Sequence, residues 1–310
     1  MKRGTNPGIG IALGSGAARG WAHIGALRAL SDLGIAPDVI CGTSVGALAG
    51  GFYLSGQLSA LEDWVRRLTK LRMLRYMDVG LGRNGLIAGN RLISEMEVHI
   101  GECLIEELPL PFAGVATDLH TGHEVWLTRG RLIDAIRASF SLPGLFEPVL
   151  IDGRWVIDGA VVNPVPVSVC HALGAEIVIA INLNGPIGIK NGGASKKGPG
   201  AIGFDALPQV SGTVLRRRGK DGPSAAANGK AAQPGLLNVL TSTLSIVQDR
   251  VTRSRLAAQP PDVNILPKLG KVGLLDFHRG AEDIEAGAAA IYQAEGEIRE
   301  ALEIFAATGS

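Results

Sequence analysis

The chain has 310 residues, 46% of them hydrophobic, with a mean hydropathy of +0.23. This is enough to bury the core of one large α/β domain or two small ones, and it excludes a chain that is disordered throughout. The 30 basic and 29 acidic residues nearly cancel, and aromatic residues make up only 5%. We therefore expect neither a strong electrostatic field nor base-stacking platforms, and no nucleic-acid partner.

Cysteines and apolar runs restrict the compartment and the cofactors. The three cysteines, Cys41, Cys103 and Cys170, form no Cys-x-x-Cys pair, which argues against a disulfide framework or a zinc knuckle and favours a reducing compartment. Polar residues break the N-terminal apolar stretch, so it is a poor signal peptide, and no apolar run approaches transmembrane length. We expect a cytoplasmic protein with no metal or other cofactor.

The first predicted unit is a strand over 8–13, a glycine-rich loop over 14–20 and a helix over 21–33. A short, apolar, β-branched run at 38–41 follows and predicts a second strand. This β-α-β order favours a parallel sheet with a right-handed crossover.

The glycine-rich loop suggests two functions. Dinucleotide binding fits poorly, because Gly14-x-Gly16-x-x-Arg19 lacks the third glycine and no acidic residue ends the second strand. An oxyanion hole fits better, because backbone N–H groups in a small-residue loop can approach a substrate carbonyl. Arg19 would brace the loop or offer a charge to a head group, and a solvated arginine is the alternative. His23 is most simply explained as a buried structural histidine.

The run Gly42-Thr43-Ser44-Val45-Gly46 lies between the second strand and an apolar helix. Gly-x-Ser-x-Gly in this setting is typical of a nucleophile elbow, in which a tight turn leaves room only for very small residues beside the serine. The hydroxyl of Ser44 would then stand near a helix N-terminus, which favours an anion. The alternative is a glycine-rich turn with an incidental serine.

Residues 55–111 are predicted to be mostly helical, with a turn at Asn84-Gly85 and a helix capped by Asn90. A run over 58–77 alternates apolar and basic positions. Its basic residues would face an anionic membrane or, more simply, form a solvated face; they are Arg66, Arg67, Lys70, Arg72 and Arg75.

Two strands, over 112–117 and 124–127, are joined by a polar segment that contains an aspartate and two histidines. These residues could suggest a metal, but the polar tip of a hairpin explains them more simply. A helix over 132–138 precedes the apolar segment 139–146, which we expect to form the wall of an apolar pocket.

Two Asp-Gly pairs follow, and they are not equivalent. Asp152-Gly153 separates two strand-like runs and predicts a two-residue hairpin turn. Asp158-Gly159 ends the second run, with no returning strand. An aspartate at a strand end is well placed to direct a carboxylate at the elbow serine, so we select Asp158 as the partner of Ser44. The later histidines, His171 and His278, stand in no recognisable catalytic setting, and a Ser–Asp pair is expected to suffice.

Composition changes over 185–235, where Gly, Ala, Ser, Lys and Pro dominate and eight basic residues face two acidic ones. We expect a largely disordered basic insertion, either a solvated linker or a segment that touches a membrane or acts as a lid. A helix over 236–257, a strand over 262–267 and a final helix over 281–305 complete the prediction. The alternation of strands and helices on both sides of the insertion predicts one interrupted domain over 8–305.

These motifs resemble, in their order, those of the patatin-like phospholipases, and most closely the bacterial branch related to neuropathy target esterase. The resemblance covers 8–183 well and 236–305 more loosely. The residues that match its motifs are Gly14, Ser15, Gly16, Ala17, Arg19, Gly20, Gly42, Ser44, Gly46, Asp158 and Gly159. The expected fold is a single-domain three-layer α/β sandwich with a mostly parallel central sheet and a nucleophile elbow.

The resemblance also implies a function. It would make the protein a calcium-independent lipid acyl hydrolase of the phospholipase A, lysophospholipase or carboxylesterase type, acting on a lipid ester or phospholipid and allowing peripheral contact at the inner membrane face. Ser44 would be the nucleophile and Asp158 the base, and the N–H groups of Ser15, Gly16 and Ala17 would form the oxyanion hole. The family loop is usually a run of glycines, so Ser15 and Ala17 are departures. The alternative is a catalytically weakened lipid- or protein-binding module of the same fold, with nucleotide binding a distant third.

Overall fold

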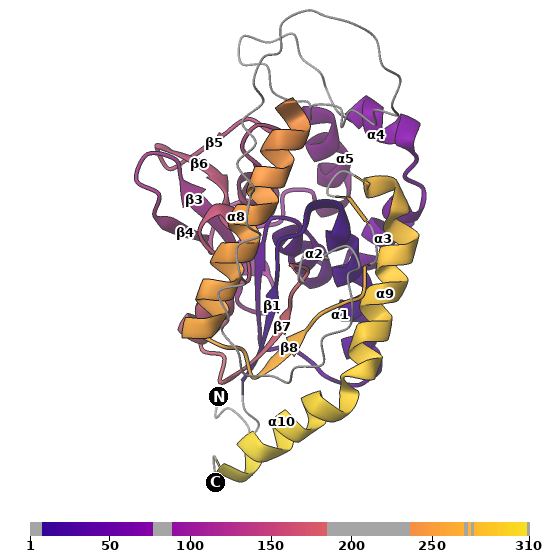
Figure 1. Ribbon diagram of the computed structural model, residues 1–310, viewed down its shortest axis with the longest axis vertical. Helices are drawn as coiled ribbons and strands as arrows, with labels where there is room; N and C mark the ends of the chain where they lie inside the picture. Colours follow the sequence, from indigo (N-terminus) through magenta and orange to yellow (C-terminus); the bar gives the residue numbers. More distant parts are fainter. Residues whose placement is uncertain (1–7, 77–88, 185–235, 270–271, 274–275, 309–310) are drawn as a thin grey trace, which may run out of the picture. The chain divides into compact units, whose positions relative to one another are not determined.

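The computed structural model describes residues 8–76, 89–184, 236–269, 272–273 and 276–308. In these ranges the strands of a mixed sheet are linked by hydrogen bonds in the order β5-β6-β3-β2-β1-β7-β8 (Figure 1). Strands β6 and β2 pair with successive parts of one edge of β3, and β4 pairs with its other edge. The pairs β1–β2, β1–β7, β2–β3 and β7–β8 are parallel, and those involving β4, β5 and β6 are antiparallel. The strand bounds are Ile9–Leu13 (β1), Val39–Thr43 (β2), Phe112–Asp118 (β3), Glu124–Leu127 (β4), Val149–Ile151 (β5), Arg154–Asp158 (β6), Ile177–Ile181 (β7) and Val263–Ile265 (β8).

Alternate side chains of the central strands enter two separate cores. Ile11 and Leu13 of β1 belong to the core that also holds α1, α2 and α9, whereas Ala12 belongs to a smaller core with Val165 and Cys170. Because successive residues of a strand point to opposite faces, both faces of the sheet are covered. The predicted three-layer α/β sandwich with a mostly parallel centre is therefore confirmed.

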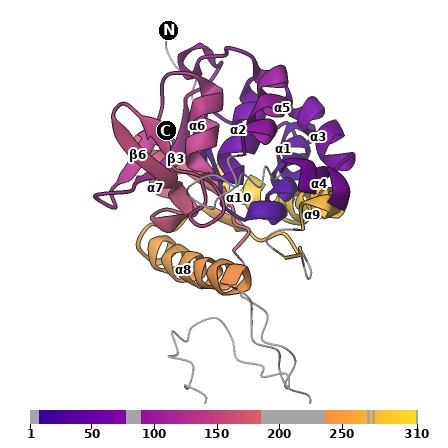
Figure 2. The same cartoon turned by 90° about the horizontal axis from the view of Figure 1, so that it is seen from above.

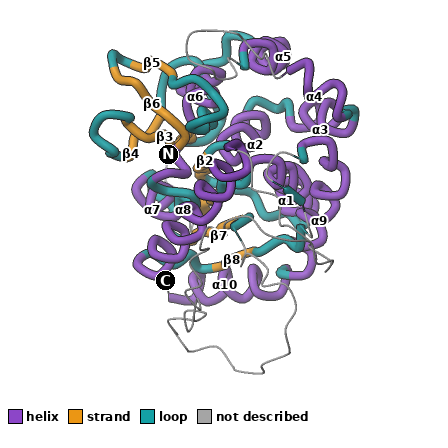
Figure 3. Tube along the Cα trace, turned by 45° about the horizontal axis from the view of Figure 1, so that its top comes forward, coloured by secondary structure: helices purple, strands orange, loops and turns teal. Residues whose placement is uncertain are grey.

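The helices surround this sheet (Figures 2 and 3). Helix α8 lies beside α7 and away from α1 in Figure 2, and α9 runs alongside α1 in Figure 3. Their bounds are Ala22–Asp32 (α1), Val45–Leu54 (α2), Leu58–Arg66 (α3), Lys70–Tyr76 (α4), Asn90–Ile100 (α5), Leu132–Ser139 (α6), Val167–Ala172 (α7), Leu236–Ala258 (α8), Gly280–Gln293 (α9) and Glu295–Thr308 (α10), with 3-10 turns η1 (Ala17–Trp21), η2 (Ile105–Glu107), η3 (Gly159–Val161) and η4 (Phe277–Arg279). None of the described helices combines the length and the apolar character that a membrane span requires.

Two local predictions were wrong, and the reason is visible in each case. The final helix is interrupted at Ala294, between α9 and α10. Asn90 does not cap α5, because the helix begins after Gly89, whose φ of 65° is in the left-handed region, and the Asn90 side chain instead accepts a hydrogen bond from Arg137. The turn expected at Asn84-Gly85 lies outside the described residues.

The chain divides into two units, 1–187 with 236–310 and 188–235. All described residues belong to the first unit. The predicted disorder of 185–235 concerns residues outside the described ranges and stays a prediction, as does the single interrupted domain.

Candidate active site

The turn between β2 and α2 has the geometry of a nucleophile elbow. Ser44 has φ 58° and ψ −123°, a conformation that a residue with a Cβ rarely adopts, and α2 begins at the next residue. A Cβ on Gly42 would lie 2.4 Å from the backbone of Gly46, and one on Gly46 would lie 2.1 Å from the Leu13 carbonyl oxygen. The glycines are therefore required because backbone passes through the space a side chain would need.

Two strands that run in opposite directions along β3 bring Asp158 to Ser44. Strand β2 is parallel to β3 and ends with Thr43 opposite Val115, and β6 is antiparallel and ends with Asp158 opposite Ala116. Strand β4 pairs with Gly114–Thr117 of β3, a range that includes residues paired with β2 and residues paired with β6. Because β4 occupies one edge of β3 over this range, β2 and β6 must both lie along the other edge. Their carboxyl ends therefore meet head to head, one residue apart along β3.

At this meeting point the Ser44 hydroxyl donates to Asp158, with 2.7 Å between Oγ and Oδ2. The other carboxylate oxygen, Oδ1, accepts from the N–H of Ala160 at 2.8 Å. Asp158 is only 1% exposed, and this burial raises its pKa to about 7, although both hydrogen bonds favour the ionised form and oppose the shift. A carboxyl with this pKa can both accept and return a proton near neutral pH.

A serine that the sequence analysis did not identify fixes the backbone of the elbow. The Ser139 hydroxyl accepts from the N–H of Ser44 at 2.9 Å and donates to the Val115 carbonyl at 2.6 Å. Ser139 is completely buried at the end of α6. No local pattern marks it, because its two partners lie far away in the chain.

We expect Ser139→Ala to lower both stability and turnover while leaving the apolar pocket intact. The change leaves the buried N–H of Ser44 without its acceptor and removes the hydrogen bond that the Val115 carbonyl accepts from Ser139, so we expect a loss of about 2 kcal/mol in the free energy of unfolding. If Ser44 attacks the ester, hydrolysis of a soluble ester should fall about tenfold in kcat with little change in KM, since only the Ser44 hydroxyl is displaced. Urea unfolding and steady-state kinetics measure these changes.

Ser141→Ala is the matched control, because the Ser141 hydroxyl bonds only the carbonyl of Arg137, one turn earlier. It should change stability by less than about 1 kcal/mol. Equal effects of the two substitutions would contradict a specific role for Ser139.

The glycine-rich loop lies beside the elbow, because β1 and β2 are parallel neighbours. Gly14 and Ser15 donate their N–H groups to the carbonyls of Ile181 and Pro164, at 3.0 and 2.8 Å. The N–H of Ser15 is thus already paired. Among the described hydrogen bonds the N–H groups of Gly16 and Ala17 have no acceptor, which narrows the expected oxyanion donors to these two.

Arg19 and His23, the two polar side chains near this loop, both form hydrogen bonds to backbone carbonyls. Arg19 is largely buried and its guanidinium donates to the Leu183 carbonyl at 3.4 Å, so the solvated alternative is wrong and the bracing role fits. His23 is fully buried, as expected, and its Nε2 donates to the Gly14 carbonyl at 2.7 Å. Burial lowers the pKa of His23 to about 4, so the imidazole is neutral at pH 7 and orients the loop.

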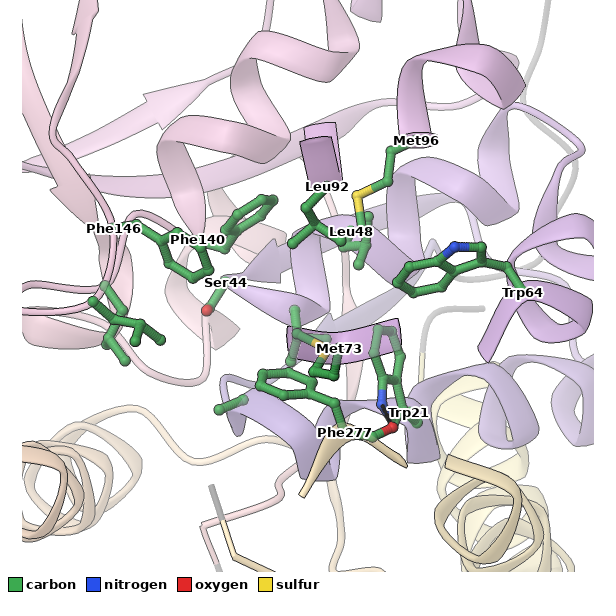
Figure 4. Close-up of a pocket in the computed structure, with 14 residues that line it drawn as sticks. Trp21, Ser44, Leu48, Trp64, Met73, Leu92, Met96, Phe140, Phe146 and Phe277 are labelled. Atoms are coloured by element: carbon green, nitrogen blue, oxygen red, sulfur yellow. Dashed lines mark hydrogen bonds between the residues drawn. The ribbon is translucent and has the colours of Figure 1, made fainter. Parts of the chain in front are cut away.

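Ser44 lies in the wall of an apolar pocket (Figure 4). In Figure 4 the serine lies close to Phe140 and Phe146, with Trp21 and Phe277 across the cavity. The lining residues are Ala17, Trp21, Ser44, Val45, Leu48, Trp64, Met73, Leu92, Met96, Phe140, Leu142, Leu145, Phe146 and Phe277. Four of them come from the segment 139–146, which confirms that this segment forms a pocket wall. Such a cavity suits a hydrocarbon chain.

The remaining sequence candidates do not join this site. Asp152 and Gly153, with φ of 48° and 77°, form the predicted hairpin turn between β5 and β6. The Nδ1 atom of His171 lies 3.0 Å from the Ala175 carbonyl oxygen, within its own helix-to-strand connection, and His278 lies in η4. No group of three potential metal ligands occurs within the described ranges.

The structure thus combines a Gly-x-Ser-x-Gly elbow, an aspartate at a strand end that accepts a hydrogen bond from the elbow serine, and a mostly parallel α/β sheet. The sequence matches the model of the family described as patatin-like phospholipase over residues 11–171. The chain belongs to this family of lipid hydrolases, as the motifs predicted.

Its relatives place it in the neuropathy-target-esterase-like branch. An uncharacterized NTE family protein of Mycobacterium tuberculosis is 31% identical, over 95% of this chain and 93% of that protein. Neuropathy target esterase sws of Drosophila melanogaster is 33% identical over 58% of this chain and 13% of the fly protein. Patatin-like phospholipase domain-containing protein 7 of Mus musculus is 32% identical over 58% and 14% of the two chains.

Proposed function

We propose that the protein is a serine acyl hydrolase that cleaves lipid esters. The observation that carries this proposal is the 2.7 Å hydrogen bond from Ser44 Oγ to Asp158 Oδ2 beside an apolar pocket. The hydroxyl is paired with a base, and the adjoining cavity is lined by the apolar side chains that an acyl chain would contact. Phospholipids, lysophospholipids and simpler carboxylic esters all present the reacting group that this arrangement requires.

The proposed reaction proceeds in two acyl-transfer steps. Asp158 takes the proton of Ser44 as the serine oxygen attacks the ester carbonyl carbon, and the N–H groups of Gly16 and Ala17 hold the resulting oxyanion. Collapse of the tetrahedral intermediate breaks the bond to the alcohol, which leaves with the proton from Asp158. Water, deprotonated by the same carboxylate, then releases the fatty acid. The base is a carboxylate that titrates near neutral pH, so the mechanism requires neither a histidine nor calcium.

Covalent labelling tests the nucleophile directly. A fluorophosphonate probe should modify the wild-type protein on the peptide that contains Ser44, and Ser44→Ala should abolish both labelling and hydrolysis of a fluorogenic ester. Ser31→Ala is the control, because among the described hydrogen bonds its hydroxyl contacts the Leu27 carbonyl and the Tyr53 hydroxyl, and Ser31 does not line the pocket. Labelling of another residue, or equal hydrolysis by Ser44→Ala and wild type, would refute the proposal.

One observation favours the second candidate, a weakened lipid-binding module of the same fold. Ala17 occupies a φ of 49° in the loop, where glycine is the favoured residue. A folded protein that retains a fluorescent lipid in the pocket without turnover, and in which Ala17→Gly raises hydrolysis, would support this alternative. Rapid hydrolysis by the wild type would exclude it.

A lipid substrate also implies contact with the aggregate that contains it. We propose that the protein meets the inner face of the membrane peripherally, with no nucleic-acid partner.

A further inference from the structure

We infer that the N-terminal half of α8 docks onto an anionic lipid bilayer, and that this contact presents the pocket to the membrane. The surface is an apolar stripe on α8, made of Val239, Leu240, Ile246 and Val247. The inference rests on the proposed function for its purpose. The surface itself, and its test, do not depend on catalysis.

The members of the apolar stripe share one side of the helix. Val239 and Ile246, and likewise Leu240 and Val247, are seven residues or about two helical turns apart, so the four side chains form two adjacent lines on one side of the helix. Their side chains are 39–54% exposed. Aliphatic side chains in a line along an exposed helix are typical of interfacial helices, whereas protein interfaces are enriched in aromatic residues and arginine. The composition therefore favours lipid over a protein partner.

The other half of α8 is anchored, which holds the apolar stripe in place. Gln248, Asp249 and Thr252 are buried. Arg255 donates to the Glu124 carboxylate at 2.9 Å and to the Val162 carbonyl at 3.1 Å, next to the turn that follows Asp158. The stripe thus lies on a helix whose other half is fixed to the segments around Asp158 (Figures 1 and 2).

Helix α8 contacts the pocket wall directly and the glycine-rich loop through Asn184. Leu240 Cδ1 lies 3.4 Å from the position a Cβ would take on Gly144, in the segment that supplies Leu142 and Leu145 to the pocket wall. Farther along, Asn184 Nδ2 bridges Thr252 Oγ1 and Ser15 Oγ, at 3.3 Å each. Helix α8 therefore spans from the pocket wall to the glycine-rich loop, so a bilayer against the stripe would lie next to the pocket.

Charge in the sequence supports an anionic bilayer as the occupant. The segment 185–235, which precedes α8 and lies outside the described residues, carries eight basic and two acidic residues. Basic residues close to an anionic membrane are attracted to its surface charge, so this excess of basic residues favours an anionic bilayer.

Cosedimentation of full-length Ser44→Ala with sucrose-loaded vesicles of phosphatidylcholine and phosphatidylglycerol tests the inference. Ser44→Ala is used so that lipid is not consumed. Adding Ile246→Ser and Val247→Ser should weaken the partition coefficient at least about tenfold, because two aliphatic side chains no longer enter the bilayer. The control carries Val98→Ser and Ile304→Ser, which are 79% and 59% exposed on α5 and α10. It should stay within about twofold of the parent, since surface substitutions elsewhere change little.

Three results would overturn the inference. The first is that the parent does not bind these vesicles, and the second is that the stripe variant binds them as tightly as the control does. The third is that gel filtration shows a dimer which only the stripe substitutions dissociate, because the stripe would then be covered by a second copy of the chain. In the wild-type background the stripe substitutions should leave hydrolysis of a soluble ester unchanged and reduce hydrolysis of vesicle lipid. A protein that binds vesicles but hydrolyses nothing would refute the proposed function and leave this inference standing.

Discussion

Asp158→Asn is expected to inactivate the protein and to stabilise its fold. An asparagine keeps the shape of the side chain and its hydrogen bond with Ala160 but cannot take a proton from Ser44, so hydrolysis should fall about 10²- to 10⁴-fold. In the wild type, kcat/KM should rise with pH and level off above about 7, because only the ionised carboxyl of Asp158, whose pKa is about 7, acts as the base.

The gain in stability follows from the same pKa. In the unfolded chain the carboxyl titrates near 3.8, whereas in the folded protein burial raises its pKa to about 7. The folded state therefore holds the proton more tightly, and the free energy of unfolding falls as pH rises from about 4 to 7. Above pH 7 the penalty is constant at about 4 kcal/mol, which Asp158→Asn removes. Urea unfolding should give a clearly higher free energy of unfolding for the variant than for the wild type at pH 8, and a much smaller difference at pH 5.

Asp152→Asn is the matched control for this experiment. Asp152 lies in the exposed turn that leads into the same strand, with a φ of 48°, which asparagine tolerates as well as aspartate does. It should change neither activity nor the pH dependence of stability. A stability difference between Asp158→Asn and wild type that does not vary with pH would contradict a raised pKa at Asp158.

Gly287→Ala is expected to cause a large loss of stability. A Cβ at Gly287 of α9 would lie 1.9 Å from the Ala22 carbonyl oxygen of α1, and one at Gly25 of α1 would lie 1.8 Å from the carbonyl oxygen of Ile284. The two helices touch through their backbones, so any side chain there must push them apart. We expect a cost of about 3 kcal/mol, measured by urea unfolding.

A glycine-to-alanine substitution in the next helix should instead raise the free energy of unfolding. Gly296 lies in α10, and nothing lies within 4 Å of its Cβ position. Gly296→Ala should stabilise the protein by up to about 0.5 kcal/mol, because alanine loses less backbone entropy in a helix and Gly296 lies in the first turn rather than in the interior of α10. Similar effects of the two substitutions would show that the contact between α1 and α9 is looser than the structure has it.

Local patterns were sufficient for the elements that position the site. The elbow over 42–46, the hairpin turn at Asp152-Gly153 and the apolar wall over 139–146 were all predicted from residues adjacent in the chain. The reason is that tight-turn sterics, hairpin chemistry and strand periodicity depend on neighbouring residues. The wrong helix cap at Asn90 shows the limit, because a distant residue, Arg137, binds the side chain that would have capped the helix.

The sequence by itself determined the class of fold, the family and the two residues, Ser44 and Asp158, that the structure places 2.7 Å apart. Only the tertiary structure decided how they meet, through β2 and β6 ending head to head beside β3. It also decided that the Ser139 hydroxyl accepts the N–H of Ser44 and that the Pro164 carbonyl accepts the N–H of Ser15. Burial in the folded protein raises the pKa of Asp158. Strand register, long-range hydrogen bonds and desolvation depend on what lies nearby in space, and the order of residues along the chain does not specify those neighbours.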